Sequence, residues 1–120
     1  MNRYQFSKLV QEFENDVAEI LGTKGESYAS EDDVLHNFKD NAARLGLEPF
    51  QIWAVYFNKH VSAIFKAIKS NPKFPEDTSE GFVSRLEDAA AYIKLGHALY
   101  QEDMIKNIAQ KLMIENTEQE

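Results

Sequence analysis

The chain has no cysteine among its 120 residues, which excludes disulfide bonds and any thiol-based site. Basic residues are also few: 13 lysines and arginines stand against 20 acids, giving a net charge of −7. This balance disfavours general binding to nucleic acid or to anionic membranes, because both present negative charge to a protein. No apolar run approaches the length of a membrane span, and no secretory signal opens the sequence. We therefore expect a cytoplasmic protein.

Glycine and proline are scarce too, with five and three residues. Apolar side chains recur every three or four positions along most of the chain, which is typical of amphipathic helices, and no stretch alternates as a β-strand does. The sequence predicts a single all-α domain over residues 1–120, a bundle of four main helices plus a C-terminal helix. The predicted helices are Tyr4–Leu21, ended by Gly22; Ser30–Leu45, capped by Ser30 and ended by Gly46; Leu47–Lys69; a helix from Ser79 or Glu80 to Tyr100; and Met104–Met113, before a polar tail at 115–120.

Each apolar stripe predicts the inner face of its helix. The first half of Leu47–Lys69 is apolar nearly all round, so we expect this helix in the middle of the bundle, contacted on several sides. It carries no acid and has Asn58-Lys59-His60 at its centre. The inner stripes predicted for the other main helices are Phe6, Leu9, Val10, Phe13, Val17, Ile20 and Leu21; Val34, Leu35, Phe38, Ala42 and Leu45; and Phe82, Leu86, Ala89, Ala90, Ile93, His97 and Tyr100.

The common nucleotide-binding and catalytic signatures are absent: no Walker loop, no Rossmann glycines, no HExxH and no GxSxG. Lys59 and Asp88 remain as two charged residues on half-apolar faces of neighbouring predicted helices. Buried charges need a partner. Either the two residues form a salt bridge, or they line a polar pocket in which Lys59 and Arg85 meet phosphate and Asp88 holds a metal ion or a base edge.

Other polar residues have simpler interpretations. His60 falls on the apolar stripe beside Phe57 and Ile64, so we expect a histidine of the core or of an interface. The acids Glu12, Asp16 and Glu19 share one face of the first helix. Such a face is usually solvated, although hard cations such as Mg²⁺ bind where several carboxylates meet.

Several short motifs resemble a known family when taken in order. They are Lys24-Gly25-x-x-Tyr28, Asn37-Phe38 after an acidic helix start, Lys59 in an apolar helix, and Arg85-x-x-Asp88-x-x-x-Tyr92. This order resembles the small nucleotide-modification-associated domain proteins of phages, prophages and bacteria, which are distantly similar to the MazG-like all-α nucleotide pyrophosphatases. The resemblance implies a MazG-like all-α fold, oligomeric assembly and a nucleotide-related site between helices, with Tyr28, Asn37, Lys59, Asp88 and Tyr92 at the matching positions.

Metal-dependent chemistry has few residues available. A two-metal attack on a nucleoside triphosphate needs several carboxylates, but the central helix has none and the second motif offers only Glu87 and Asp88. These two residues are the weak candidates for Mg²⁺, and pyrophosphatase activity is doubtful on this count.

Two hypotheses follow. The chain is a nucleotide-binding or nucleotide-processing protein with Lys59, Arg85 and Asp88 at the ligand and Tyr28 stacked on a base. Alternatively, it is a non-enzymatic interaction protein of phage origin that binds a host protein through its acidic surface or its C-terminal helix. The apolar C-terminal helix also suggests a homodimer, the commonest closed assembly; alternatively, this helix folds back on its own chain.

Overall fold

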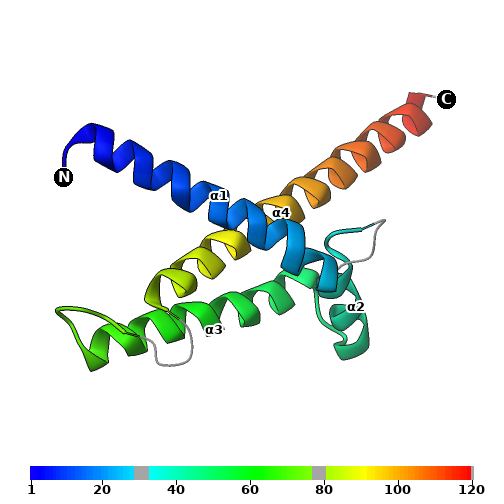
Figure 1. Cartoon of the computed structure of the whole chain (residues 1–120). Helices are drawn as coiled ribbons and strands as arrows, with labels where there is room; N and C mark the ends of the chain where they lie inside the picture. Colours follow the sequence, from blue (N-terminus) through cyan, green and yellow to red (C-terminus); the bar gives the residue numbers. More distant parts are fainter. Residues whose placement is uncertain (29–32, 77–80, 120) are drawn as a thin grey trace.

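The computed structural model describes residues 1–28, 33–76 and 81–119, and their regular structure is helical (Figure 1). The side chains of 23–28 and 118–119 are outside this description. The four helices are α1 (Arg3–Tyr28), α2 (His36–Leu45), α3 (Pro49–Ser70) and α4 (Phe82–Gln119). The predicted all-α class is therefore confirmed. None of the described helices is long and apolar enough to cross a membrane.

The predicted end of the first helix at Gly22 is wrong, because α1 continues through Gly22 to Tyr28. Glycine permits a helix end without requiring one, and Gly22 keeps a negative φ here. The expected connection Thr23–Ala29 is thus helical up to Tyr28, and Ala29 lies outside the described residues.

The start of α2 also differs from the prediction, since the helix begins at His36 rather than after Ser30. The expected cap residues 30–32 lie outside the described residues. A carboxylate oxygen of Asp33 accepts the backbone N–H of Leu35 at 2.9 Å and forms the turn before the helix. The predicted end at Gly46 is confirmed: its φ of 68° is the left-handed conformation that glycine adopts without strain.

Helix α3 begins at Pro49, as predicted for a residue that lacks a backbone donor. The side chain of Gln51 accepts the backbone N–H of Glu48 at 2.8 Å and supports this first turn. The helix does not lie in the middle of a bundle, however. It packs against α4 and α2, and Val55 and Phe65 remain about two thirds exposed, at 66% and 65%. The expectation of burial on several sides is therefore wrong.

Helix α4 is one element of 38 residues, and the predicted separate C-terminal helix is its continuation. The polar residues Gln101–Asp103, which lie between the two predicted helices, do not end it. Glu102 pairs with Lys106 one turn on, at 3.2 Å, and with Lys39 of α2, at 2.6 Å. These pairs hold the polar stretch in helical conformation, since side chains four residues apart are neighbours on a helix.

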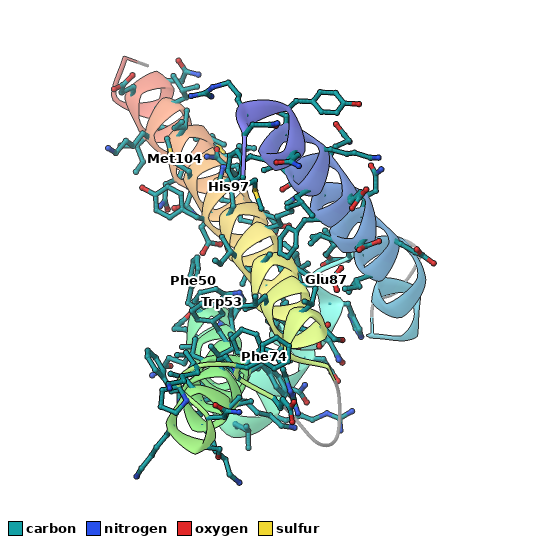
Figure 2. The ribbon with its side chains drawn as sticks, turned by 60° about the vertical axis from the view of Figure 1, so that its left-hand side comes forward. Phe50, Trp53, Phe74, Glu87, His97 and Met104 are labelled. Carbon is teal, nitrogen blue, oxygen red and sulfur yellow. The ribbon has the colours of Figure 1, made fainter. Side chains whose placement is uncertain are left out.

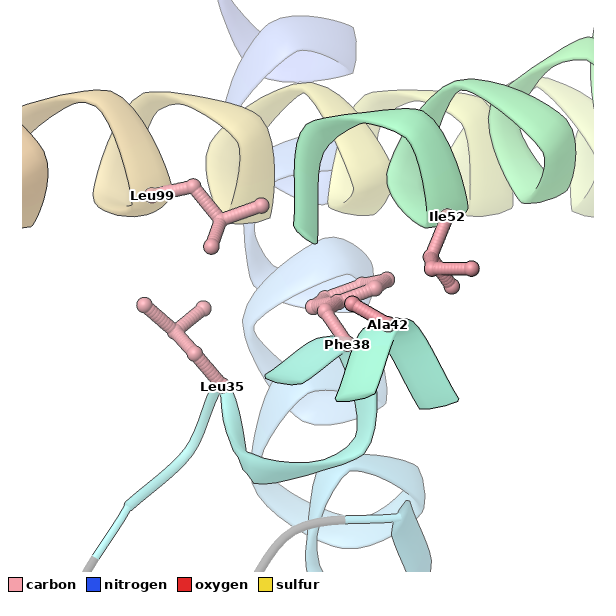
Figure 3. Packing of buried hydrophobic residues seen from close by; sticks show 5 residues of the cluster. All are labelled: Leu35, Phe38, Ala42, Ile52 and Leu99. Atoms are coloured by element: carbon pink, nitrogen blue, oxygen red, sulfur yellow. The ribbon is translucent and has the colours of Figure 1, made fainter. Parts of the chain in front are cut away.

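Helix α4 is also the element that the others contact: both α3 and α1 pack on it. A small core forms where α2 and α3 meet it, at Leu35, Phe38, Ala42, Ile52 and Leu99 (Figure 3). The inner stripe predicted for this helix is wrong. Ile93 and Tyr100 are exposed, whereas the buried positions belong to another face of the helix: Asp88, Ala91, Gly96 and Leu99.

The stripes predicted for the first two helices are buried only in part. In α1, Val17 is buried, Phe13, Ile20 and Leu21 are half-buried, and Phe6, Leu9 and Val10 are exposed. In α2, Phe38 and Ala42 are buried, as is Leu35 just before the helix, but Val34 and Leu45 are exposed. The reason is visible in Figure 1: α1 crosses α4, and beyond the crossing the two helices diverge. The chain is consequently elongated, 65 × 38 × 26 Å, with a radius of gyration of 18.7 Å.

Candidate functional site

Tyr92 lies at the centre of an aromatic cluster between α3 and α4. Its ring centroid is 4.8 Å from that of His60, 6.4 Å from Tyr56 and 6.3 Å from Phe38 of α2. His60 follows Tyr56 by four residues, so both side chains project from the same face of α3 toward Tyr92. We call the four residues Phe38, Tyr56, His60 and Tyr92 the Tyr92 cluster. It offers flat rings and one titratable imidazole in a single place.

Asp88 lies one turn before Tyr92 on the same face of α4, and its side chain is only 7% exposed. Because residues i and i+4 of a helix lie side by side, Asp88 places an acceptor group next to the Tyr92 cluster. Sequence reasoning expected Asp88 to be half-buried, and the structure buries it further.

The register between the two helices is fixed by Trp53 of α3. Its indole Nε1–H donates to the backbone carbonyl of Tyr92 at 2.6 Å, and its ring stacks on Phe57 with centroids 4.9 Å apart. The indole approaches α4 this closely because Gly96 has no side chain there. Figure 2 shows Phe50 and Trp53 together on the side of α3 that meets α4. This contact sets which turn of α4 faces His60.

Lys59, the residue expected beside Asp88, is exposed rather than half-buried. In the described part of the chain no hydrogen bond or salt bridge joins Lys59 to Asp88. Successive helical residues point about 100° apart, so with His60 turned toward Tyr92, Lys59 lies on the solvent flank of the same turn. It is a cation at the rim of the Tyr92 cluster.

The remaining candidates are distributed around this seam. Arg85 and Glu87 are half-buried in the first two turns of α4, and Asn37 is half-buried in the first turn of α2, next to Phe38. In Figure 2 Glu87 lies on the side of α4 that faces α1, away from Trp53. Tyr28 is the last residue of α1, and its side chain is outside the described residues.

The metal candidates Glu87 and Asp88 do not form a larger acidic group. Adjacent positions of one helix direct their side chains to different faces. Among the described residues, no three histidines, aspartates or glutamates lie close enough together to hold a metal ion.

Sequence reasoning did not assign three members of the cluster, Phe38, Tyr56 and His60, to the site. Phe38 was expected in the inner stripe of the second helix and His60 in the core or an interface, and Tyr56 lies beside the apolar stripe of α3. For Tyr56 and His60 the available signal was their spacing of four residues, which places two polar-tipped rings on one face of a helix that lacks acids.

A second polar cluster joins α2 to α4 and has a structural character. The Lys39 ammonium lies 2.6 Å from a carboxylate oxygen of Asp33 and 2.6 Å from one of Glu102. Its hydrogen bonds lower the pKa of both carboxyl groups, and the two carboxylates, Asp33 foremost, raise the pKa of Lys39. Each of the three side chains is about one third exposed, so these ion pairs lie at the surface. We call Asp33, Lys39 and Glu102 the surface clamp.

Comparison with protein-family models, with curated proteins and with solved structures finds no match to this chain. The resemblance to nucleotide-modification-associated domain proteins therefore stays a prediction from the sequence.

Proposed function

We propose that the chain binds a nucleotide at the seam between α3 and α4. The observation that supports this most directly is the buried Asp88 carboxylate, 7% exposed, one turn from an aromatic cluster that contains a histidine. Aromatic rings stack on nucleobases, and a carboxylate accepts hydrogen bonds from amino groups at a base edge.

Cationic groups stand near the same seam. Lys59 is at its rim on α3, and Arg85 precedes Asp88 by three residues on α4. A lysine is a common partner for phosphate as a point charge, and an arginine binds it through two parallel hydrogen bonds. In this proposal Tyr92 and His60 contact the base, Asp88 accepts from its edge, and Lys59 and Arg85 meet the phosphates.

The proposal is for binding rather than hydrolysis. Metal-assisted hydrolysis needs carboxylates enough to hold the ions and an attacking water, and Glu87 and Asp88 are too few for this. In this proposal Mg²⁺ binds together with the nucleotide and neutralises the charge of its phosphates.

The test is a thermal unfolding screen of nucleoside mono-, di- and triphosphates with and without Mg²⁺, at one protein concentration. A ligand at 100 times its dissociation constant stabilises the native state by about 2.7 kcal/mol. For a domain of this size that is a rise in Tm of roughly 10 °C. If no nucleotide raises the Tm, the proposal fails.

Variants locate the site. Lys59→Ala removes a charge from an exposed position, so it should leave the Tm of the free protein unchanged and weaken affinity by roughly 10- to 100-fold. Lys69→Ala, at another exposed position of α3, is the matched control and should bind as the wild type does. Asp88→Asn keeps the shape and should change the preference among bases. Wild-type affinity and base preference in both site variants would place the ligand elsewhere.

Interaction with another protein is the second candidate function. It is favoured by the exposure of apolar side chains in the C-terminal half of α4, where Ile105 is 65% and Ile108 51% exposed. Capture from lysate with the wild type, compared with Ile108→Glu, tests a host partner. Equal capture by both chains would argue against this part of α4 as the contact.

A further inference from the structure

The apolar stripe of α1 is buried at one end and exposed at the other. Val17 is fully buried where α1 crosses α4, and Phe13 is half-buried one turn earlier. On the same face, Phe6, Leu9 and Val10 are 56%, 48% and 44% exposed. The stripe is continuous at helical spacing. Its N-terminal part has no cover within the described chain because α1 leaves α4 beyond the crossing (Figure 1).

Helix α4 also has an apolar stripe on the side that faces α1, and the exposed part of this stripe lies toward the C-terminus of the helix. At the crossing, the Lys94 ammonium lies 2.7 Å from a carboxylate oxygen of Glu14, so this side of α4 faces α1. Positions 11, 14 and 18 residues further on return to the same side of a helix. They are Ile105, Ile108 and Leu112, with Met104 beside them, and their exposure runs from 43% to 65%.

The exposed area is larger than a folded monomer of this mass leaves open. A monomer of 13.8 kDa has about 6,600 Å² of accessible surface, and this chain has 9355 Å². The excess of roughly 2,700 Å² is about three times the area that each partner buries in a standard interface. The radius of gyration, 18.7 Å, likewise exceeds the value of about 14 Å expected for 120 residues.

We infer that a second copy of this chain covers both stripes, with the N-terminal half of α1 from each chain crossing the C-terminal half of α4 from the other. One chain already makes this contact once, between the buried end of the α1 stripe at Val17 and the part of α4 around Lys94. A two-fold axis next to the exposed parts of the two stripes generates the same α1–α4 contact between the two chains. The assembly is then closed, as in isologous interfaces. No further partner is then needed, because each chain supplies both surfaces. The inference is independent of nucleotide binding.

The absence of native cysteine allows a direct test of this pairing. Leu9→Cys and Ile108→Cys are prepared as two separate chains of 120 residues, mixed and oxidised. We expect a disulfide-linked species of twice 13.8 kDa, formed roughly tenfold faster in the mixture than in either chain alone. Equal rates in all three samples, or linkage confined to Leu9→Cys alone, would overturn the proposed crossing.

Sedimentation of the chain without introduced cysteines measures the mass of the assembly independently of cross-linking. We expect the dimer mass, and Ile108→Glu should raise the dissociation constant by about 30-fold or more. Val55→Glu is the matched control, since Val55 is 66% exposed but lies on α3 outside both stripes; it should leave the dimer intact. A wild-type chain that stays at the monomer mass, whether or not Ile108→Glu folds, refutes the second copy and points to a different protein as the occupant.

Discussion

Replacement of Gly96 by alanine tests the contact that sets the register of α3 on α4. A methyl group at this position would lie 2.7 Å from Cζ2 and 2.8 Å from Cε2 of the Trp53 indole. Carbon atoms in ordinary contact are about 3.5–4.0 Å apart. Either the indole or the helix must therefore move by roughly 1 Å.

The indole has little freedom to move. It stacks on Phe57 with an interplanar angle of 12° and donates a 2.6 Å hydrogen bond to the Tyr92 carbonyl. Overpacking of this kind costs about 1–3 kcal/mol, and loss of the hydrogen bond about 1 kcal/mol. Alanine recovers about 1 kcal/mol because it favours the helix over glycine. The net expectation is a loss of about 1–3 kcal/mol in the free energy of unfolding.

Urea unfolding measures this loss. Trp53 is the only tryptophan of the chain, so its fluorescence reports on the seam, while far-UV circular dichroism reports on the helices. Gly96→Ala should lower the urea midpoint with an unchanged m-value and shift the Trp53 emission toward that of an exposed indole. Both chains must be compared at one protein concentration, because self-association adds to apparent stability.

Two comparisons decide whether the reasoning holds. Gly96→Ala combined with Trp53→Phe should recover part of the loss, since the smaller ring removes the clash and contacting residues are not additive. The reasoning is refuted if Gly96→Ala is as stable as the wild type and the Trp53 emission does not change.

Two further predictions concern α1 and the surface clamp. Gly22→Ala should stabilise the protein by about 0.5–1 kcal/mol, because no atom lies within 4 Å of the added methyl and α1 is helical there; a loss of stability would mean that α1 ends at Gly22. Lys39→Met should cost about 1 kcal/mol or less near neutral pH. The lowered pKa values of Asp33 and Glu102 make their contribution present above the ordinary values of 3.8 and 4.5 and lost as the pH falls below them. The raised pKa of Lys39 makes its contribution present below 10.5 and lost as the pH rises through the raised value. The free energies of unfolding of the wild type and of Lys39→Met, measured across pH, should therefore converge at both extremes of pH. A difference that stays constant across pH would rule the clamp out.

The helix positions that could be predicted depend on local chemistry. Gly46 ends α2 in the left-handed conformation that glycine adopts without strain, and Pro49 starts α3 because it lacks the backbone donor that a helix interior requires. Gly22 lacks such a requirement: glycine tolerates both a helix interior and a helix end. The break that the sequence predicts between Tyr100 and Met104 is absent, since the residue that anchors Glu102 is Lys39, on a different helix.

The sequence predicts the α4 side of the candidate site but not the α3 side. The alignment of Asp88 with Tyr92 follows from their spacing on α4 and is present in the structure. Their partner on α3 depends on the rotation of that helix about its axis, and Lys59 and His60 differ by about 100° in direction. Trp53 fixes the rotation through a backbone carbonyl and a glycine, neither of which has a sequence signature for this contact.

The error in α4 has a physical reason that bears on assembly. The helix has two apolar faces: one, with Leu99, is buried against α2 and α3, and the other, with Ile93, Tyr100 and Met104, is exposed. The second face holds the larger side chains, so periodicity alone selects it as the inner one. Apolar spacing shows that a face avoids water, but it does not show whether the cover comes from the same chain. Helix α4 already packs against α1 and α3, and its C-terminal half still exposes apolar side chains, so a copy of the same chain can supply the cover that these side chains lack.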